Sequence, residues 1–442
     1  MVSATWSAIC ALILTPVVVA SDQNPWPTFH GPKRDNIVHE TGLLKQWPKD
    51  GPRMLWRFKE CGKGYACVTI AQGMLFTSGD FGDEEMVLAL DLDGRLKWKT
   101  PHGKAWKGAQ PGSRTTPTYS DGCVYHLGPH GNLSAFDAAT GKQIWTIDVR
   151  EKFDAPFRTW GYTENLLVDG DKVFCMPGGA KGRVVAFDKK TGKVLWANIV
   201  IEDRAAYSSP ILAVHNGVKQ LIALARSSVV GLDAETGKLL WSHAHESTCD
   251  QNVTSPIYDQ GRVFVTSGHK AGARVFQLPV LEQRQPASGN AEQGQLAPGS
   301  VERRQAVSAP CKELWFGTQL DNCHGGVVLL DGYLYGSGCR MYNKGLLCVE
   351  FATGRVMYRA EEIGKVSLTY ADGLLYCFDN DGAMLLVKPT PQSATIVSRF
   401  PIPKKDTEHT LTHPVICGGR LYLRHLNDLF AYDIQDRGVA VK

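Results

Sequence analysis

The chain has 442 residues, of which 43% are hydrophobic and 21% are charged, and its formal net charge is +4. This apolar content is sufficient for a large buried core, so disorder is excluded as the overall state. The sequence contains no block of Lys and Arg that could follow a phosphate backbone, which excludes nucleic acid as a main partner.

The first 20 residues are predicted to be a signal peptide. The stretch from Ala4 to Ala20 is uncharged and mainly apolar, and it ends in Val18-Val19-Ala20, which suits cleavage before Ser21. The alternative is an uncleaved anchor, because the stretch is close to the length that spans a bilayer. We therefore expect an exported protein, periplasmic or secreted, with no membrane span after the signal is removed and with a lead-in segment at 21–51.

A repeat of about 45 residues follows, and each copy combines an Asp, a Gly-containing turn and a Trp. The four clear copies are DLDGRLKW (91–98), AFDAATGKQIW (135–145), AFDKKTGKVLW (186–196) and GLDAETGKLLW (231–241). Their tryptophans stand 47, 51 and 45 residues apart, which is the length of a four-stranded propeller blade. A fainter copy, EFATGRVMY, occupies 350–358.

A second pattern gives an independent count of the repeats. Strands that begin after a tight turn start near residues 73, 122, 171, 218, 261, 332, 373 and 419. Alternating apolar residues and frequent Gly, Asp and Asn favour antiparallel strands throughout. The eight starts predict an all-β, eight-bladed propeller of four-stranded antiparallel blades over residues 52–436.

The repeated turn and its tryptophan explain why the blades associate. Asp137, Asp188 and Asp233 are expected to accept hydrogen bonds from the turn that follows, while the glycine of that turn takes a positive φ. The Trp is then expected to lie across the neighbouring blade and to remove about 150–250 Å² from water, a gross gain of roughly 4–6 kcal/mol.

Two further features concern closure of the ring and the length of one blade. The last repeat ends near Asp433 without an outer strand, whereas residues 52–58 have the outer-strand pattern without inner strands before them. The N-terminal strand should therefore complete the last blade and remove two exposed edges. The segment 281–310 lacks aromatic residues and is rich in Gln, Ala, Gly, Ser and Pro, which predicts a disordered insertion within blade five, before the outer strand at 312–316.

Eleven cysteines remain after the signal peptide, most of them in apolar strand-like stretches. Buried, unpaired thiols are the expected state, because a chain of this length does not need disulfide staples. Cys61 could bridge Cys67, and Cys323 could bridge Cys339; the spacing alone leaves both pairings open.

The phrase Ala-Phe-Asp-x-x-Thr-Gly-Lys-x-x-Trp at 135–145 and 186–196 resembles the tryptophan-docking motif of pyrroloquinoline-quinone (PQQ) repeat proteins. The likeness extends from Trp56 to Asp433. It implies either a non-enzymatic propeller, such as the periplasmic scaffold of the outer-membrane β-barrel assembly machinery, or a quinoprotein alcohol dehydrogenase. The lead-in Trp26-Pro27-x-Phe29-x-Gly31-Pro32 is similar to that of PQQ-like repeat proteins of unknown function. Fold alone does not choose between these functions.

The enzyme branch of the family requires features that the sequence does not display. Quinoprotein dehydrogenases have two adjacent cysteines over the quinone, and this chain has no Cys-Cys pair and no CxxCH haem motif. They also hold a calcium ion beside the quinone, and no recognisable set of carboxylate ligands occurs here. No cofactor is therefore expected, and PQQ with calcium belongs only to the alternative function.

The best candidate site is the ring of residues that begin the innermost strands. Counting back from each turn places a polar and aromatic set around the central channel: Tyr65, Arg114, Trp160, Tyr207, Asn252, Asn322, His324, Lys365 and His413. The functional interpretation is a pocket for an anionic or aromatic molecule, with Arg114 and Lys365 as charge partners and Trp160 as a stacking wall. The competing interpretation, which we weight more heavily, is a wet channel whose polar lining contacts water and backbone.

Two histidine pairs have spacings that could hold a metal, namely His126 with His130 and His243 with His245, but structural roles are favoured. No catalytic residue and no metal ligand is assigned. The sequence predicts an exported, monomeric propeller that acts as a non-catalytic binding or scaffold module for a protein or cell-envelope partner. The alternatives are a PQQ-dependent oxidoreductase and a small-molecule sensor that uses the channel.

Overall fold

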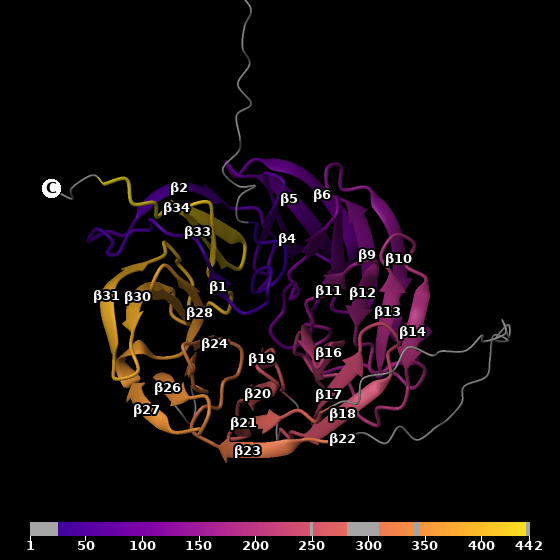
Figure 1. Ribbon diagram of the computed structural model, residues 1–442. Helices are drawn as coiled ribbons and strands as arrows, with labels where there is room; N and C mark the ends of the chain where they lie inside the picture. Colours follow the sequence, from indigo (N-terminus) through magenta and orange to yellow (C-terminus); the bar gives the residue numbers. More distant parts are fainter. Residues whose placement is uncertain (1–24, 248–250, 281–308, 340–343, 439–442) are drawn as a thin grey trace, which may run out of the picture.

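The computed structural model describes residues 25–247, 251–280, 309–339 and 344–438. These residues form eight sheets around a common centre, each built on four antiparallel strands, and two of the sheets have a short fifth strand that pairs in parallel (Figure 1). Regular helix within them is confined to α1 (Val149–Lys152), which is capped by Asp148, and to a 3₁₀ turn at Glu361–Ile363. The eight-bladed all-β propeller predicted from the repeats is confirmed.

The first four blades follow one another along the chain. Blade one contains β3 (Thr69–Ala71), β4 (Met74–Phe81), β5 (Glu84–Asp91) and β6 (Leu96–Lys104). Blade two contains β7 (Thr118–Ser120), β8 (Cys123–Leu127), β9 (Asn132–Asp137) and β10 (Gln143–Asp148). Blade three contains β11 (Leu167–Asp169), β12 (Lys172–Cys175), β13 (Val184–Asp188) and β14 (Val194–Asn198). Blade four contains β15 (Ile211–His215), β16 (Val218–Leu224), β17 (Ser228–Asp233) and β18 (Leu239–Ala244).

The remaining blades complete the circle. Blade five contains β19 (Ile257–Asp259), β20 (Arg262–Ser267), β21 (Gly272–Gln277) and β23 (Lys312–Gly317). Blade six contains β24 (Val327–Leu330), β25 (Tyr333–Ser337), β26 (Leu346–Glu350) and β27 (Val356–Ala360). Blade seven contains β28 (Val366–Ala371), β29 (Leu374–Asp379), β30 (Ala383–Pro389) and β31 (Ala394–Pro401). Blade eight contains β32 (Val415–Cys417), β33 (Arg420–His425), β34 (Asp428–Asp433) and β2 (Arg53–Phe58).

The N-terminal strand β2 closes the ring against the C-terminal strand β34. Trp56 pairs with Ala431 and Phe58 pairs with Leu429 in an antiparallel register. Arg57 adds a two-pronged ion pair to Asp428, with its Nε and Nη2 at 2.9 and 3.0 Å from the carboxylate oxygens. The predicted closure is therefore present, and the sequence ends of the propeller lie in one sheet (Figure 1).

Docking tryptophans join blades eight, one, two, three and five to the blades that follow them. Trp98 donates its indole N–H to the carbonyl of Ala138 in blade two, at 2.9 Å. Its ring also lies against Gly141, where a Cβ would come within 2.5 Å of the indole. The same indole hydrogen bond to the following blade is made by Trp56, Trp145, Trp196 and Trp315. The glycine at the turn is thus required for close approach as well as for its positive φ.

Trp241 departs from the other docking tryptophans in its hydrogen bond. Its indole N–H donates to Gln220 Oε1 of its own blade at 2.6 Å, and its ring is fully buried against Gly231. Blade five cannot accept the indole hydrogen bond in the usual way, because the connection between β21 and β23 contains the long insertion instead of the short Gly turn. Only the hydrogen bond of Trp241 differs from those of the other docking tryptophans, because its ring still lies against the next blade, edge-on to Phe276 of β21 with ring centroids 5.7 Å apart, as expected.

The lead-in segment reaches across the ring and touches several blades. Trp26 pairs with Ile70 of blade one through two backbone hydrogen bonds. Arg34 donates to the carbonyls of Asn165 and Leu166, just before β11 of blade three, at 2.8 and 2.9 Å. The short strand β1 (Ile37–Val38) then runs parallel to β28 of blade seven. The segment therefore links blades on opposite sides of the centre.

The outer strand expected after the predicted insertion is present, since β23 pairs with β21 of blade five. Residues 281–308 are outside the described part of the chain, as is the predicted signal peptide at 1–20. The last two residues of the predicted insertion, Ala309 and Pro310, form β22 and pair in parallel with Trp241 and Ser242 of β18. Among the described residues, no helix is both long and apolar enough to cross a bilayer.

Candidate functional site: the central cavity

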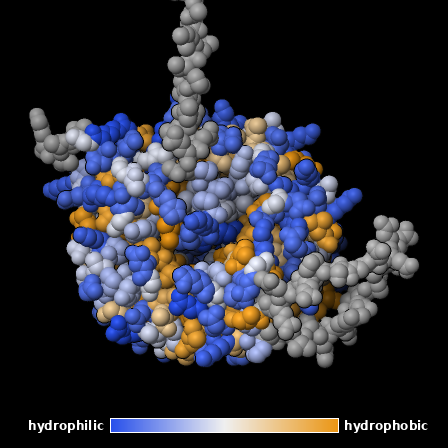
Figure 2. Space-filling model, in the orientation of Figure 1, coloured by the Kyte–Doolittle hydropathy of each residue, from blue (hydrophilic) through white to orange (hydrophobic). Residues whose placement is uncertain are grey.

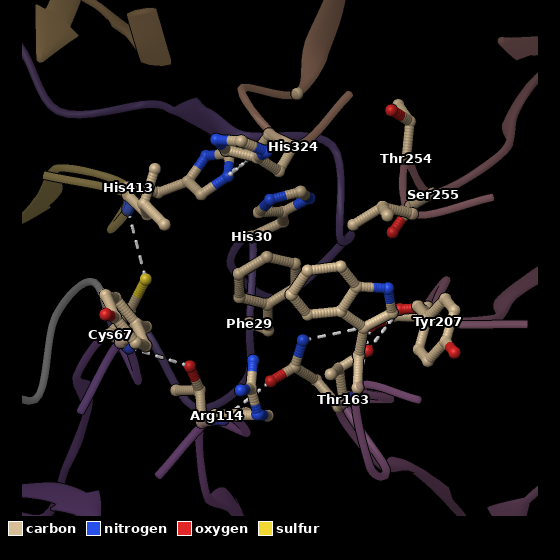
Figure 3. A pocket seen from close by; sticks show the side chains of 18 of the residues that line it. Phe29, His30, Cys67, Arg114, Thr163, Tyr207, Thr254, Ser255, His324 and His413 are labelled. Atoms are coloured by element: carbon tan, nitrogen blue, oxygen red, sulfur yellow. Dashed lines mark hydrogen bonds between the residues drawn. The ribbon is translucent and has the colours of Figure 1, made fainter. Parts of the chain in front are cut away.

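A cavity of about 370 Å³ lies at the centre of the ring. Its walls come from the segments that lead into the innermost strands, where the blades converge (Figure 3). The space-filling view shows the ring face hollowed at the centre (Figure 2). This volume is in the range of small-molecule pockets, which are usually few in one protein.

Most of the ring residues singled out from the sequence line this cavity. The seven that do so are Tyr65, Arg114, Trp160, Tyr207, His324, Lys365 and His413. Asn252 and Asn322 do not, because both side chains are fully engaged within the blades. Asn252 donates to the carbonyls of Ala225 and Arg226, each at 2.8 Å. Asn322 donates to the Ser337 carbonyl at 2.7 Å and accepts from Thr254 Oγ1.

Two lining residues come from the lead-in segment and were not predicted as site residues. Phe29 stacks on His30 with ring centroids 3.7 Å apart, and both rings contact His413, at 5.3 and 4.5 Å. Figure 3 shows them in the middle of the cavity wall, among side chains from several blades. The aromatic, Pro and Gly residues at 26–32 set this segment apart in the sequence. Its position in the fold could not be predicted, because it depends on contacts with distant blades and not on the repeated motif.

Three histidines meet on this wall as neutral imidazoles. Burial lowers the pKa of His30 and His324 well below the ordinary value and lowers the pKa of His413 to about 4. The ring of His413 is held on both sides, because its Nε2 donates to the His324 carbonyl at 2.9 Å and its Nδ1 faces Asn36 Nδ2 at 3.3 Å. The Nε2 atoms of His30 and His324 are buried without a hydrogen-bond partner in the described structure.

Arg114 provides positive charge on another wall. Its guanidinium lies 5.2 Å from the ring centre of Trp106 and donates to the carbonyls of Ala109 and Gln110. Burial lowers its pKa to about 10, which leaves it charged at neutral pH. Lys365 is the second cation of the lining, and no Asp or Glu occurs among the described residues that line the cavity. The cavity thus favours anions and aromatic rings over cations.

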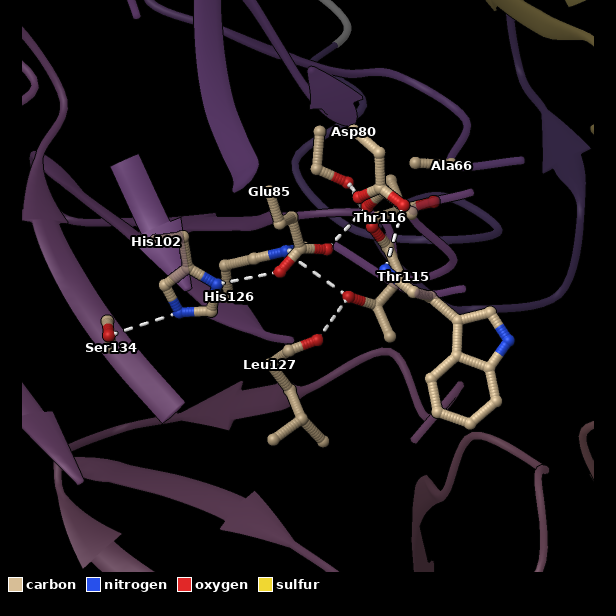
Figure 4. Close-up of polar contacts among 12 residues, drawn as sticks. Ala66, Asp80, Glu85, His102, Thr115, Thr116, His126, Leu127 and Ser134 are labelled. Atoms are coloured by element: carbon tan, nitrogen blue, oxygen red, sulfur yellow. Dashed lines mark hydrogen bonds and ion pairs between the residues drawn. The ribbon is translucent and has the colours of Figure 1, made fainter. Parts of the chain in front are cut away.

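A separate buried cluster joins blades one and two beneath the cavity wall. Glu85 accepts from His102 Nδ1 at 2.9 Å and from Ser113 Oγ at 2.6 Å, and it lies 3.3 Å from His126 Nε2 (Figure 4). The three side chains are fully buried, and the two imidazoles hold the pKa of the Glu85 carboxyl well below its usual range despite that burial. Ser134 holds the far side of His102 at 3.1 Å. This network fixes the two blades together.

The histidine pairs noted in the sequence do not converge. His126 belongs to the Glu85 cluster, whereas His130 Nε2 lies 3.2 Å from the Ala105 carbonyl. His245 Nε2 bonds Ser267 Oγ at 2.9 Å, while His243 stacks on Phe276 at 4.8 Å.

Known proteins with related sequences fall into two groups. The outer membrane protein assembly factor BamB of Yersinia pestis is 24% identical over 358 residues, which cover 77% of this chain and 80% of that protein. The quinoprotein alcohol dehydrogenase PedH of Pseudomonas putida is 32% identical over 99 residues, 22% of this chain. The matched region spans only 16% of PedH and 21% of a second relative, quinohemoprotein alcohol dehydrogenase ADH-IIG of Pseudomonas putida.

Solved structures agree on the fold. BamB from Moraxella catarrhalis superposes with a TM-score of 0.55 over 83% of this chain and 94% of that one, at 14% identity. Quinohemoprotein alcohol dehydrogenase from Comamonas testosteroni gives a TM-score of 0.63 over 96% and 82% of the two chains, also at 14% identity. Structural likeness at this identity establishes the propeller and leaves the activity open.

A family model described as outer membrane protein assembly factor BamB matches residues 83–356. This region includes the docking turns of blades one to four and the tryptophans of blades one to five, and it extends into blade six. Because the match covers more than half of the chain, the protein belongs to the BamB family of PQQ-like repeat propellers.

Proposed function

We propose that this propeller is an exported, non-catalytic binding module of the cell envelope that holds a protein partner. The proposal is supported by the extent of the likeness to BamB, whose name describes an assembly factor, over most of both chains. The sequence likeness to the alcohol dehydrogenases is shorter, 99 residues for PedH and 154 residues for ADH-IIG, or 22% and 32% of this chain. A rigid closed ring with exposed loops is well suited to present a fixed surface.

The observation that carries the proposal is the chemistry of the cavity lining. Calcium takes oxygen ligands and is usually held by carboxylates, yet the described lining contains no Asp or Glu and has the cations Arg114 and Lys365. The residues present therefore do not fit the calcium ion that accompanies PQQ in the enzyme branch. We derive no oxidation step at this site.

An aromatic patch beside the cavity mouth is the surface that best fits a protein partner. Phe157 is 59% exposed and stacks on Trp106 with ring centroids 5.8 Å apart. Arg150 lies 5.7 Å from the Phe157 ring centre, and Trp160 of the same loop lines the cavity. Aromatic and Arg side chains grouped in this way are typical of the residues that dominate binding at protein interfaces.

Site-specific photocrosslinking in the native host tests this role. A photoreactive phenylalanine analogue at position 157 should give an adduct of one defined mass in the envelope fraction. The matched control places the analogue at Val214, which is 60% exposed on blade four and outside the patch. No adduct from position 157, or the same adducts from both positions, would contradict the proposal.

A second candidate function is binding of a small anion in the cavity, and the two cations and the aromatic side chains of the lining favour it. A ligand that binds only the folded state raises the melting temperature. Terephthalate, an aromatic dianion, should therefore stabilise the wild-type protein and leave Arg114→Gln unaffected. Arg95→Gln, at an exposed arginine of blade one, is the control and should respond like wild type. An absence of any shift with wild type would exclude this class of ligand.

A further inference from the structure

Two thiols and one imidazole meet between blades five and six. Each residue offers one ligand atom, a sulfur from Cys323, a sulfur from Cys339 and a ring nitrogen from His269, and these three atoms lie within 4.8 Å of one another. The residues come from three separate connections, the turn between β20 and β21, the segment before β24 and the end of β25. We propose that these three side chains form a zinc site that pins blade five to blade six.

The ligand types and spacing suit zinc. Zn²⁺ is held in proteins by Cys sulfur at about 2.3 Å and His nitrogen at about 2.0–2.1 Å in tetrahedral geometry, so neighbouring ligand atoms stand roughly 3.4–3.8 Å apart. The two sulfurs and the imidazole nitrogen already lie within 4.8 Å of one another, so only a small inward shift would bring them to the separations found around bound zinc. Hard cations such as calcium and magnesium prefer oxygen and are disfavoured by the two sulfurs.

The imidazole is oriented by a neighbouring amide. His269 Nε2 lies 2.9 Å from Gln251 Oε1, and an amide oxygen only accepts, so this nitrogen carries the proton. The lone pair is then on Nδ1. A second ring nitrogen bonded to a carbonyl oxygen is the usual support for a metal-binding histidine, because it fixes both tautomer and orientation.

The backbone around the thiols is shaped to admit them. A Cβ on Gly268 would lie 2.2 Å from Cys323 Sγ, so only glycine leaves room for the sulfur at this position. Asp321 is fully buried and anchors the two connections, since its carboxylate accepts from the Cys339 N–H at 2.9 Å and from the Lys270 N–H at 3.2 Å. Cys323 and Cys339 are nearly buried, which keeps the sulfurs from bulk solvent.

The site also has a route for the ion. Gln251, which holds the imidazole, lines the central cavity, and so does His324, which follows Cys323. Three protein ligands leave the fourth zinc position for water on the cavity side, as at open zinc sites. This inference does not depend on the proposed binding function, because it concerns blades five and six and not the aromatic patch.

Cobalt substitution gives the direct test. The reduced, full mature chain is stripped of metal and titrated with Co²⁺, and the thiolate-to-cobalt charge-transfer band in the near-ultraviolet is recorded. We expect one equivalent of Co²⁺ to produce the band and one equivalent of Zn²⁺ to abolish it. Cys323→Ser and Cys339→Ser should remove the band, and His269→Ala should weaken zinc affinity by at least about 100-fold.

Controls keep the test decisive. Cys123→Ser removes a half-buried thiol in blade two and should leave the band intact. His269 is half-exposed in a turn, so His269→Ala tests the site even where a cysteine variant fails to fold. The proposal is overturned if reduced wild type shows no thiolate band, if the band persists in Cys323→Ser, or if Cys323 and Cys339 are found as a disulfide whose reduction yields no metal binding.

Discussion

Arg34 and His413 are polar side chains that the fold buries where the lead-in segment meets the blades. Arg34 is 8% exposed and His413 is 7% exposed. Each is acceptable there because most of its polar atoms have partners: carbonyls of blade three for Nη1 and Nη2 of Arg34, and the His324 carbonyl for Nε2 of His413. Single residues of this kind fix how the lead-in segment sits on the ring, and their replacement should be costly.

Arg34→Met keeps the length of the side chain but removes its donors. The carbonyls of Asn165 and Leu166 then lose a buried partner, so the free energy of unfolding should fall by about 3 kcal/mol. Urea denaturation monitored by tryptophan fluorescence measures the change. Lys33→Met is the matched control, because Lys33 is exposed one position earlier. Equal stability of the two variants would show that Arg34 does not anchor the segment.

His413 should make the protein less stable in mild acid. Its pKa is about 4 in the folded state because of burial, against about 6.5 for a histidine in an unfolded chain. Below pH 6.5 the unfolded chain therefore binds a proton that the folded state refuses, and stability is lost as the pH falls from 6.5 towards 4. The loss attributable to this residue is about 2 kcal/mol between pH 6.5 and 5.

Denaturation at pH 7 and pH 5 checks this dependence. His413→Gln should reduce the difference between the two pH values, because glutamine has no proton to gain. His39→Gln alters an exposed histidine of the lead-in segment and should retain the wild-type difference. A His413→Gln variant with an unchanged difference would rule out the neutral, buried imidazole.

At the scale of elements, the blade turn was predictable because its causes are local. Asp137 accepts from the Thr140 N–H at 2.8 Å, and the same bond recurs at Asp188 and Asp233. These short-range preferences are visible in the sequence wherever the phrase occurs. The different hydrogen bond of Trp241 was not visible in its own phrase, because it depends on the turn that blade five lacks.

The close approach of glycine and tryptophan at the junction of blades one and two can be measured. Gly141 has a φ of +73°, and an added Cβ would meet the Trp98 ring at 2.5 Å. Gly122, in the same blade, has a φ of +80° with open space around it. Both Gly→Ala changes incur backbone strain, but Gly141→Ala should lower the free energy of unfolding by about 1–3 kcal/mol more than Gly122→Ala, because it also overpacks the junction.

Thermal or urea unfolding of the two variants decides the point. A similar loss for both would mean that the indole moves aside easily, so that the tryptophan contributes little to blade docking. The Trp98→Leu background offers a further check, since the extra loss at Gly141 should shrink when the smaller side chain is present.

At the scale of the whole molecule, counting the strands in the sequence predicted the closed ring, whereas it predicted only part of the cavity lining. Seven predicted residues line it because the innermost strands of a propeller necessarily converge. Asn252 and Asn322 point into the blades and away from the cavity, because they bond to carbonyls of neighbouring connections. Phe29 and His30 lie in the cavity wall because the lead-in segment contacts blades that are distant in the sequence. Such contacts have no local signal in the sequence, so these residues could not be assigned.

The ring as a whole has the form shared by BamB and the alcohol dehydrogenases, so the proposed function depends on the chemistry of the cavity lining. The described lining combines neutral imidazoles, aromatic rings and two cations, without a carboxylate for a hard metal ion. A module that binds a partner without oxidising a substrate is consistent with that chemistry. The cavity would then either hold the surrounding loops in place or bind an anion.

Titration of the purified mature protein with PQQ, with and without Ca²⁺ and followed by dye-linked oxidation of ethanol, tests this conclusion most directly. An authentic quinoprotein alcohol dehydrogenase serves as the positive control. We predict no calcium-dependent binding of PQQ and no dye reduction above the rate without protein. Stoichiometric, calcium-dependent binding of PQQ accompanied by turnover would contradict the assignment of a non-catalytic module.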